Sequence, residues 1–205
     1  MPPIYINLAV EDVLSEAVLR KMLKSSGREY IVQRCFMKEG FGYLKKQVSA
    51  FNHAAKITPF LLLTDLDTTE CPPVLIQDWL SCPKHPNLIF RIAVREVEAW
   101  LLAHHKAFAK FAGISADLIP QNIEAREDAK KCLISLVGKS SQRDLREDIV
   151  PYPKSTATQG RNYNNRLMLF VDKFWNPSIA MENSPSLRRA LDAIAKFEPI
   201  SILKS

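Results

Sequence analysis

The stretch FLLLTDLD, residues 60–67, decides the fold. Four apolar residues run straight into a Thr-Asp-Leu-Asp sequence, and a fully apolar run is typical of strands buried in parallel sheets. The prolines of the TTECPP sequence that follows favour the start of a helix over residues 74–80. The stretch therefore predicts a buried strand that ends in two aspartates, Asp65 and Asp67.

Strand and helix patterns alternate on both sides of this strand. Strand patterns cover residues 4–10, 29–37 and 88–94, and helical periodicity covers residues 12–27, 43–56 and 96–111. Gly40 and Gly42 indicate a turn after the second strand. Because this alternation implies crossover connections, we predict an α/β domain over residues 1–113, with a mainly parallel sheet of about four strands flanked by helices.

Beyond Gly113 no strand pattern appears in the sequence. Helical patterns cover residues 117–138, 162–175 and 184–197. Ser184 suits the cap of the last helix and Pro185 its first residue. Between these patterns lies a polar, basic stretch over residues 139–161, and a loop of that length is either functional or disordered. We predict that residues 114–205 form a helical extension packed on the sheet domain.

The charge of the chain is distributed unevenly. The net charge is +6, yet residues 59–125 carry five Lys and Arg against eight Asp and Glu, so the rest of the chain carries +9. Basic flanks around an acidic centre favour an enzyme that binds a polyanion and a metal, although basic proteins that bind no nucleic acid are equally common. No apolar run reaches the roughly 18 residues of a membrane helix, and no signal-peptide pattern is present, so we expect a cytoplasmic protein without membrane contact.

Five carboxylates follow the predicted strands at their carboxyl ends, where ligands gather in parallel sheets. They are Glu11, Asp65, Asp67, Glu96 and Glu98. Carboxylates this close repel one another unless a cation neutralises them, and an all-oxygen site selects Mg²⁺ or Mn²⁺. An extended strand would turn both aspartates to one face. Each residue also has a purely structural interpretation, because Asp caps turns and Glu suits the first turn of a helix.

The order of an apolar strand, Glu11, a helix and then strand-Asp65-x-Asp67 resembles the TOPRIM domain of topoisomerases, primases and OLD-family nucleases. Together with REVEAWLLA (residues 95–103), GRNYNNRL (160–167) and SPSLRRAL (184–191), it resembles more closely a bacterial family of TOPRIM-like proteins of unknown function. The broader resemblance covers about residues 4–112. The narrower one covers nearly the whole chain.

The TOPRIM resemblance implies roles for these acids. Glu11 would act as general acid/base or bridge metals, Asp65 and Asp67 would bind Mg²⁺, and Glu96 or Glu98 would complete a second metal site. The sequence departs from the topoisomerase pattern, because no glycine closely follows Glu11, and topoisomerase activity is therefore not expected.

Nucleic acid, with DNA as the first expectation, would be held by basic residues of the extension. They are Lys139, Arg143, Lys154, Arg161 and Arg166, with Tyr152 and Tyr163 as stacking rings, and a solvated loop with local ion pairs is the alternative. The resemblance also implies a separate ATPase partner and a place in anti-phage defence. The sequence leaves three functions open: a nuclease, a non-catalytic metal-binding adaptor and a small-molecule phosphohydrolase.

Overall fold

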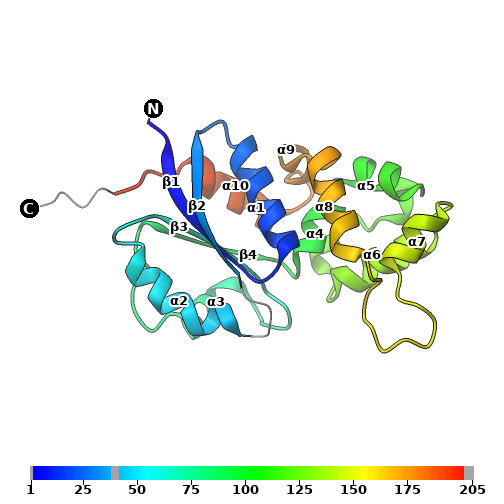
Figure 1. The fold of residues 1–205 in the computed structure, drawn as a ribbon, viewed down its shortest axis with the longest axis horizontal. Coiled ribbons are helices and arrows are strands. Elements are labelled where there is room, and N and C mark those ends of the chain that lie inside the picture. Colours follow the sequence, from blue (N-terminus) through cyan, green and yellow to red (C-terminus); the bar gives the residue numbers. More distant parts are fainter. Residues whose placement is uncertain (1, 38–41, 201–205) are drawn as a thin grey trace, which may run out of the picture.

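A four-stranded parallel sheet in the order β2-β1-β3-β4 forms the centre of the computed structural model, which describes residues 2–37 and 42–200 (Figure 1). The strands are β1 (Ile4–Val10), β2 (Tyr30–Met37), β3 (Phe60–Asp65) and β4 (Leu88–Ala93). Asp65 pairs with Ala93, so the strands β3 and β4 end side by side. The predicted α/β class is confirmed. The expected turn at Gly40 lies outside the described residues.

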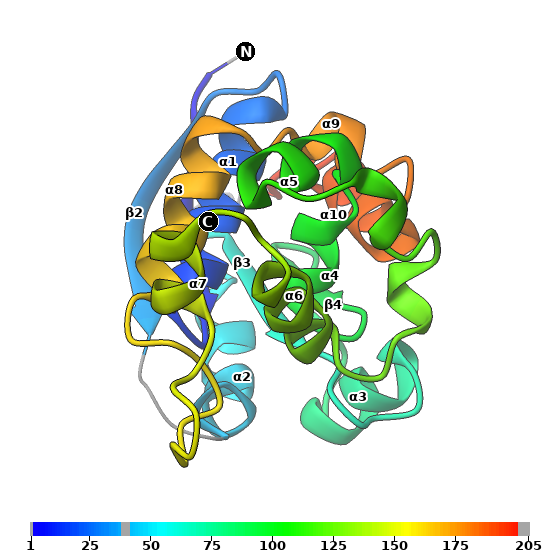
Figure 2. The same cartoon turned by 90° about the vertical axis from the view of Figure 1, so that its right-hand side faces the viewer.

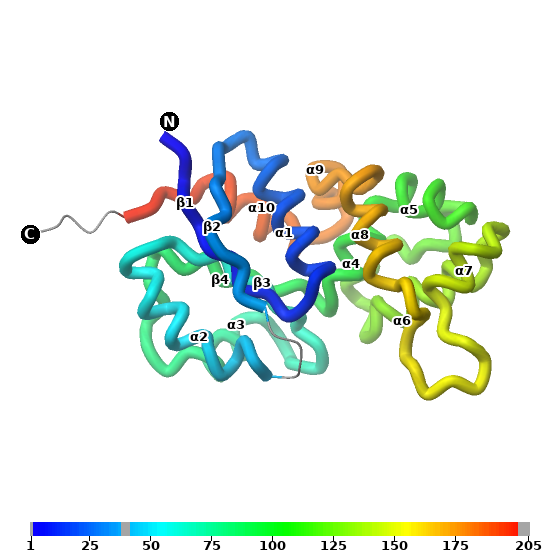
Figure 3. Tube along the Cα trace, in the orientation of Figure 1, coloured from blue at the N-terminus to red at the C-terminus, as the bar shows by residue number. Residues whose placement is uncertain are grey.

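Helices cover both faces of the sheet, as Figures 1 and 3 show. On one side, Leu62 and Phe90 pack with apolar residues of α2 (Tyr43–Ala54) and α3 (Pro72–Trp79). On the other side, Leu61 and Leu63 share a core with α1 (Val13–Ser25) and α10 (Pro185–Ala195). Successive residues of β3 therefore enter opposite cores, which explains why the strand is apolar without interruption.

The chain after β4 forms two helices where one was predicted over residues 96–111. They are α4 (Val97–Leu102) and α5 (His105–Ala112), and α5 ends at Gly113, whose φ of 62° suits glycine. Between them, His104 has a non-helical backbone, and its ring Nδ1 accepts a hydrogen bond from the backbone N–H of Asn176 at 3.1 Å. The predicted stop at Gly113 is confirmed, whereas the single long helix is wrong.

The region after Gly113 is helical, as predicted. Its helices are α6 (Ala129–Gly138), α7 (Arg143–Ile149), α8 (Tyr163–Lys173), α9 (Pro177–Ala180) and α10, and two short 3-10 turns precede α6. Of the helix expected over residues 117–138, only the last ten residues form α6. The predicted polar loop is shorter than expected, because α7 occupies part of it. Ser184 caps α10 by accepting a hydrogen bond from the backbone N–H of Leu187 at 3.2 Å, as predicted.

One continuous core joins the sheet and these helices. Trp100 of α4 is fully buried, and its indole N–H donates to the Ser186 hydroxyl at 2.7 Å. Trp175 in turn donates to the carbonyl of Trp100 at 3.0 Å. The N-terminal end of α10 is thereby tied to the helix that follows β4. Among the described residues, no helix is both long and apolar enough to cross a bilayer.

Candidate functional site

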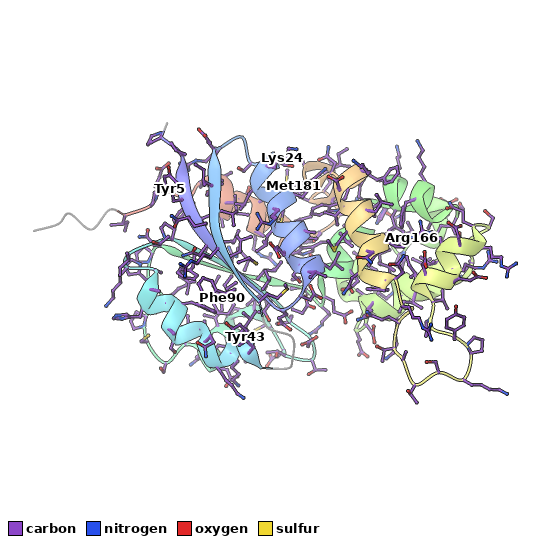
Figure 4. The ribbon with its side chains drawn as sticks, in the orientation of Figure 1. Tyr5, Lys24, Tyr43, Phe90, Arg166 and Met181 are labelled. Atoms are coloured by element: carbon purple, nitrogen blue, oxygen red, sulfur yellow. The ribbon has the colours of Figure 1, made fainter. Side chains whose placement is uncertain are left out.

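A pocket of about 220 Å³ opens between the carboxyl ends of β1 and β3 and the helices α2 and α3. Its polar lining includes Glu11, which follows β1, and Asp65 and Asp67 from the end of β3. The opposite wall includes Tyr43 at the start of α2, labelled in Figure 4, and Trp79 of α3. Three of the five predicted site carboxylates therefore meet in one pocket.

Thr64 connects the two strands at this pocket. Its buried hydroxyl donates a hydrogen bond to Glu11 Oε1. Because β1 and β3 are neighbouring parallel strands, this contact holds the Glu11 carboxylate beside the end of β3. Thr64 is not among the predicted site residues, although its position directly before Asp65 is a signal that identifies it.

The backbone turns sharply after β3, which ends at Asp65. Asp67 has a φ of 48°, so the expectation that an extended strand carries both aspartates on one face is wrong. The turn is held by Arg95, whose carbonyl accepts from the N–H groups of Leu66 and Asp67 at 2.9 and 3.1 Å. Its guanidinium donates to the carbonyl of Thr69 at 2.6 Å. A turn therefore places Asp67 at the pocket. Aspartate adopts the positive φ of this turn more readily than most other residues do.

Burial raises the pKa of all three pocket carboxyl groups. Asp65 is the most buried of the three, whereas Glu11 and Asp67 lie at the rim and are only partly desolvated. The pKa of Asp65 lies well above its ordinary range, through burial first and then through the negative charges of Glu98, Glu11 and Asp67. Burial is also the largest cause of the raised pKa of Glu11, and the hydrogen bond from Thr64 opposes it. This concentration of negative charge favours a bound cation.

Glu96 and Glu98, the acids predicted for a second metal site, do not line this pocket. Glu96 Oε2 accepts a hydrogen bond from the backbone N–H of Lys130 at 2.8 Å, near the start of α6. Glu98 lies inside the protein, although its charge still raises the pKa of Asp65. The structure thus places both acids next to the helical extension, and their role as metal ligands stays a prediction.

Glu98 forms a buried pair with Tyr163 of α8. The Tyr163 hydroxyl donates to Glu98 Oε1 at 2.7 Å, and both side chains are almost completely removed from solvent. Burial raises the pKa of Glu98 to about 7, against the opposing effect of this hydrogen bond. The expectation that Tyr163 offers a ring for base stacking is therefore wrong, because the ring is only 1% exposed.

The donor chemistry of the pocket fits a hard divalent cation. Glu11, Asp65 and Asp67 offer only carboxylate oxygens, the ligands that Mg²⁺ and Mn²⁺ prefer. Within residues 2–37 and 42–200, no three His, Cys, Asp or Glu side chains already surround one point as metal ligands. These three residues are the ones that would hold such an ion.

Comparisons with known protein families, characterised proteins and solved structures found no match to this chain. The TOPRIM relationship therefore stays a prediction.

Two of the five basic residues predicted to contact nucleic acid are paired with acids. Arg143 Nε lies 2.7 Å from Glu147 Oε1 within α7. Arg166 of α8, labelled in Figure 4, lies 3.0 Å from Asp144 through Nη2 and contacts Asp148 through Nε. For these two arginines, the expected alternative of local ion pairs holds in place of free contacts to nucleic acid, because acidic side chains already neutralise their charges.

The other three basic residues, Lys139, Lys154 and Arg161, are exposed and make no ion pair within the described ranges. Lys154 and Arg161 belong to the loop of residues 150–162. The Arg161 guanidinium lies over the Tyr152 ring, 5.8 Å from its centroid. Figures 1 and 2 show this loop extending toward the side of the molecule where α2 and α3 lie. The loop therefore presents cations and one exposed ring on that side.

Gly160 closes the base of this loop. Its backbone N–H donates to the carbonyl of Ile149 at 2.9 Å, and a Cβ added to it would lie 2.2 Å from the carbonyl oxygen of Asp148. Gly160→Ala is therefore expected to lower the free energy of unfolding by about 1–3 kcal/mol, because the backbone has to shift. Urea denaturation measures this change.

Gly138→Ala is the matched control. Gly138 ends α6, and a Cβ there would meet nothing within 4 Å. We expect this variant to be unchanged or slightly more stable, since alanine favours helices. Equal destabilisation of both variants would contradict the close approach at Gly160.

Proposed function

We propose that this protein is a Mg²⁺- or Mn²⁺-dependent nuclease that cleaves phosphodiester bonds in the cytoplasm. The observation that carries the proposal is the meeting of Glu11, Asp65 and Asp67 in one pocket, with the pKa of each raised by burial. Carboxylates arranged in this way are costly to keep charged unless a cation is bound. The order of these acids in the sequence, which resembles that of TOPRIM enzymes, supports the same class of reaction.

The chain's own residues have distinct roles in this proposal. Asp65 and Asp67 would hold the metal, and Asp65 is kept in place by the hydrogen bond that its Oδ1 accepts from Val97 N–H at 2.9 Å. A bound divalent ion lowers the pKa of a coordinated water and neutralises charge on the phosphate. Glu11, oriented by Thr64, takes up the proton that the attacking water loses, and its raised pKa brings it closer to the operating pH.

A polymeric substrate is favoured by the loop of residues 150–162. Its cations Lys154 and Arg161 are not neutralised by a described ion pair, and phosphate contacts supply most of the affinity for a nucleic acid. The exposed Tyr152 ring gives an unpaired base a surface for stacking. We therefore propose a DNA strand, rather than a mononucleotide, as the substrate.

Cleavage is expected to depend on the metal. Single-stranded oligonucleotides, duplexes and a plasmid are incubated with the protein in Mg²⁺, in Mn²⁺ and in EDTA. We expect products with either metal and none in EDTA. Cleavage that persists in EDTA would contradict the proposal. So would a failure to cleave any of these substrates with either metal.

Loss of the loop cations is expected to weaken binding more than loss of a paired arginine. The double variant Lys154→Gln/Arg161→Gln removes two phosphate donors and should weaken oligonucleotide binding by about tenfold or more, with a shallower salt dependence. Arg143→Gln is the matched control, since Glu147 already neutralises that arginine. Fluorescence anisotropy at several salt concentrations measures both effects. An equal loss of affinity in the control would contradict a specific contact between the loop and the oligonucleotide.

A metal-binding adaptor is the second candidate function. It is favoured by the finding that no set of three ligands is already assembled around one point in the part of the chain described. In that case a partner, such as the separate ATPase chain that the OLD-family resemblance implies for anti-phage defence, would complete the site. Calorimetric Mn²⁺ binding without turnover would support the adaptor over the nuclease.

A further inference from the structure

A second pocket, of about 190 Å³, lies along the outer edge of β4. Among the strands of the described residues, β4 lies at the edge of the sheet and pairs with β3. The pocket is lined by Lys84, by residues 88–91 of β4 and by Ala193 and Phe197 at the end of α10. It shares no lining residue with the carboxylate pocket, which lies beside α2 and α3.

The polar lining of this pocket is cationic. Lys84 Nζ donates to the carbonyl of Leu88 at 2.9 Å, and Arg91 Nη1 donates to the carbonyl of Arg189 at 3.3 Å. These are hydrogen bonds to neutral carbonyls, so neither charge is cancelled. An ammonium has three donors and a guanidinium five, and most of them remain for a ligand.

No acid neutralises this cluster within the described part of the chain, where the ion pairs found do not include Lys84, Arg91 or Arg189. Burial lowers the pKa of Lys84, and the neighbouring Arg91 lowers it further. Burial also lowers the pKa of Arg91, with Arg189 acting in the same direction. Arg91 therefore repels Lys84 and Arg189 in a partly desolvated place, and a bound anion would relieve that repulsion.

We propose that the pocket at the edge of β4 is an oxyanion site of the phosphate class, in which Lys84 and Arg91 hold the ligand. A planar guanidinium matches two oxygens of a phosphate, and an ammonium adds a compact charge, so the pair recognises a tetrahedral oxyanion by both shape and charge. The pocket lies between the backbone of β4 and the end of α10. It therefore admits only a small ligand group. The site is independent of the proposed nuclease centre.

Isothermal calorimetry with inorganic phosphate, at constant ionic strength, tests this site. We expect saturable binding of one phosphate to the unmodified chain and at least tenfold weaker binding to Lys84→Gln and to Arg91→Gln. Lys106→Gln is the matched control. It removes the same positive charge from an exposed residue of α5, which does not line this pocket. Circular dichroism shows whether each variant is folded, and Lys84 lies outside the helices and strands, so Lys84→Gln is decisive if Arg91→Gln does not fold.

Two further arms identify the source of the anion and separate this site from the carboxylate pocket. If an oligothymidylate displaces phosphate, the ligand is a nucleic-acid backbone, and if it does not, the ligand is a free phosphate. Glu11→Gln is expected to bind phosphate as the unmodified chain does, whatever its effect on cleavage. Absence of saturable phosphate binding, binding unaffected by Lys84→Gln, or capture of a glutamate-rich peptide in place of phosphate would each overturn the proposal.

Discussion

Asp65→Asn is expected to reduce Mg²⁺-dependent cleavage by at least about 10³-fold while making the fold more stable at neutral pH. Activity falls because an amide is a poor ligand for a hard cation and cannot replace the charge. Stability rises because burial and the charges of Glu98, Glu11 and Asp67 disfavour the ionised carboxylate that the variant lacks. The asparagine Oδ1 can still accept the hydrogen bond from Val97 N–H.

Two measurements on the same preparations check this result. Cleavage is followed on a labelled oligonucleotide, and the free energy of unfolding is obtained from urea denaturation without metal. Asp172→Asn is the control, since Asp172 lies exposed on α8 and its carboxylate pairs with the neighbouring Lys173. Activity lost together with stability would indicate a structural role for Asp65, and unchanged activity would contradict its place in the site.

Glu98→Gln is expected to stabilise the protein by about 3 kcal/mol above pH 8 and by less than about 1 kcal/mol at pH 5. Burial raises the pKa of Glu98 from its ordinary value of 4.5 to about 7, so the folded state binds this proton more tightly than the unfolded state does. Below the ordinary value both states are protonated. As the pH rises toward 7 the unfolded state loses the proton first, and stability falls. Above pH 7 the full cost of the buried charge is present.

Urea denaturation of both proteins between pH 5 and pH 8.5 measures this dependence. A glutamine Oε1 can still accept the hydrogen bond from the Tyr163 hydroxyl, so the variant changes the charge and little else. Glu182→Gln is the control, because Glu182 is exposed, and its effect should not vary with pH. A stabilisation of the same size at pH 5 and pH 8.5 would show that the charge of Glu98 is not its cause.

The sheet was predictable because its strands carry their own signals. The apolar run of residues 60–63 is buried from both faces, and Gly113 and Ser184 end and begin helices through local backbone chemistry. The break between α4 and α5 was not predictable in this way. It lies at His104, whose hydrogen bond partner Asn176 is 72 positions away in the sequence.

The sequence predicted which acids meet at the candidate site better than it predicted how they are positioned there. Glu11, Asp65 and Asp67 meet because parallel strands end along one edge. The turn that positions Asp67 depends on Arg95, and the burial of Glu98 depends on Tyr163, 65 positions away. Such pairings between distant residues have no periodic signal in a single sequence, so they could not be foreseen from it.

The attachment of α10 to the sheet has a consequence for synthesis on the ribosome. Ser186 of α10 accepts from the backbone N–H of Val94 at 3.3 Å, and Tyr30 of β2 donates to the carbonyl of Ile194 at 2.7 Å. All four strands are translated long before this helix emerges, and the sheet face that α10 covers together with α1 lacks part of its cover during that interval. Exposed strands of this kind are prone to aggregation, so the nascent chain is a natural client for a chaperone until α10 docks.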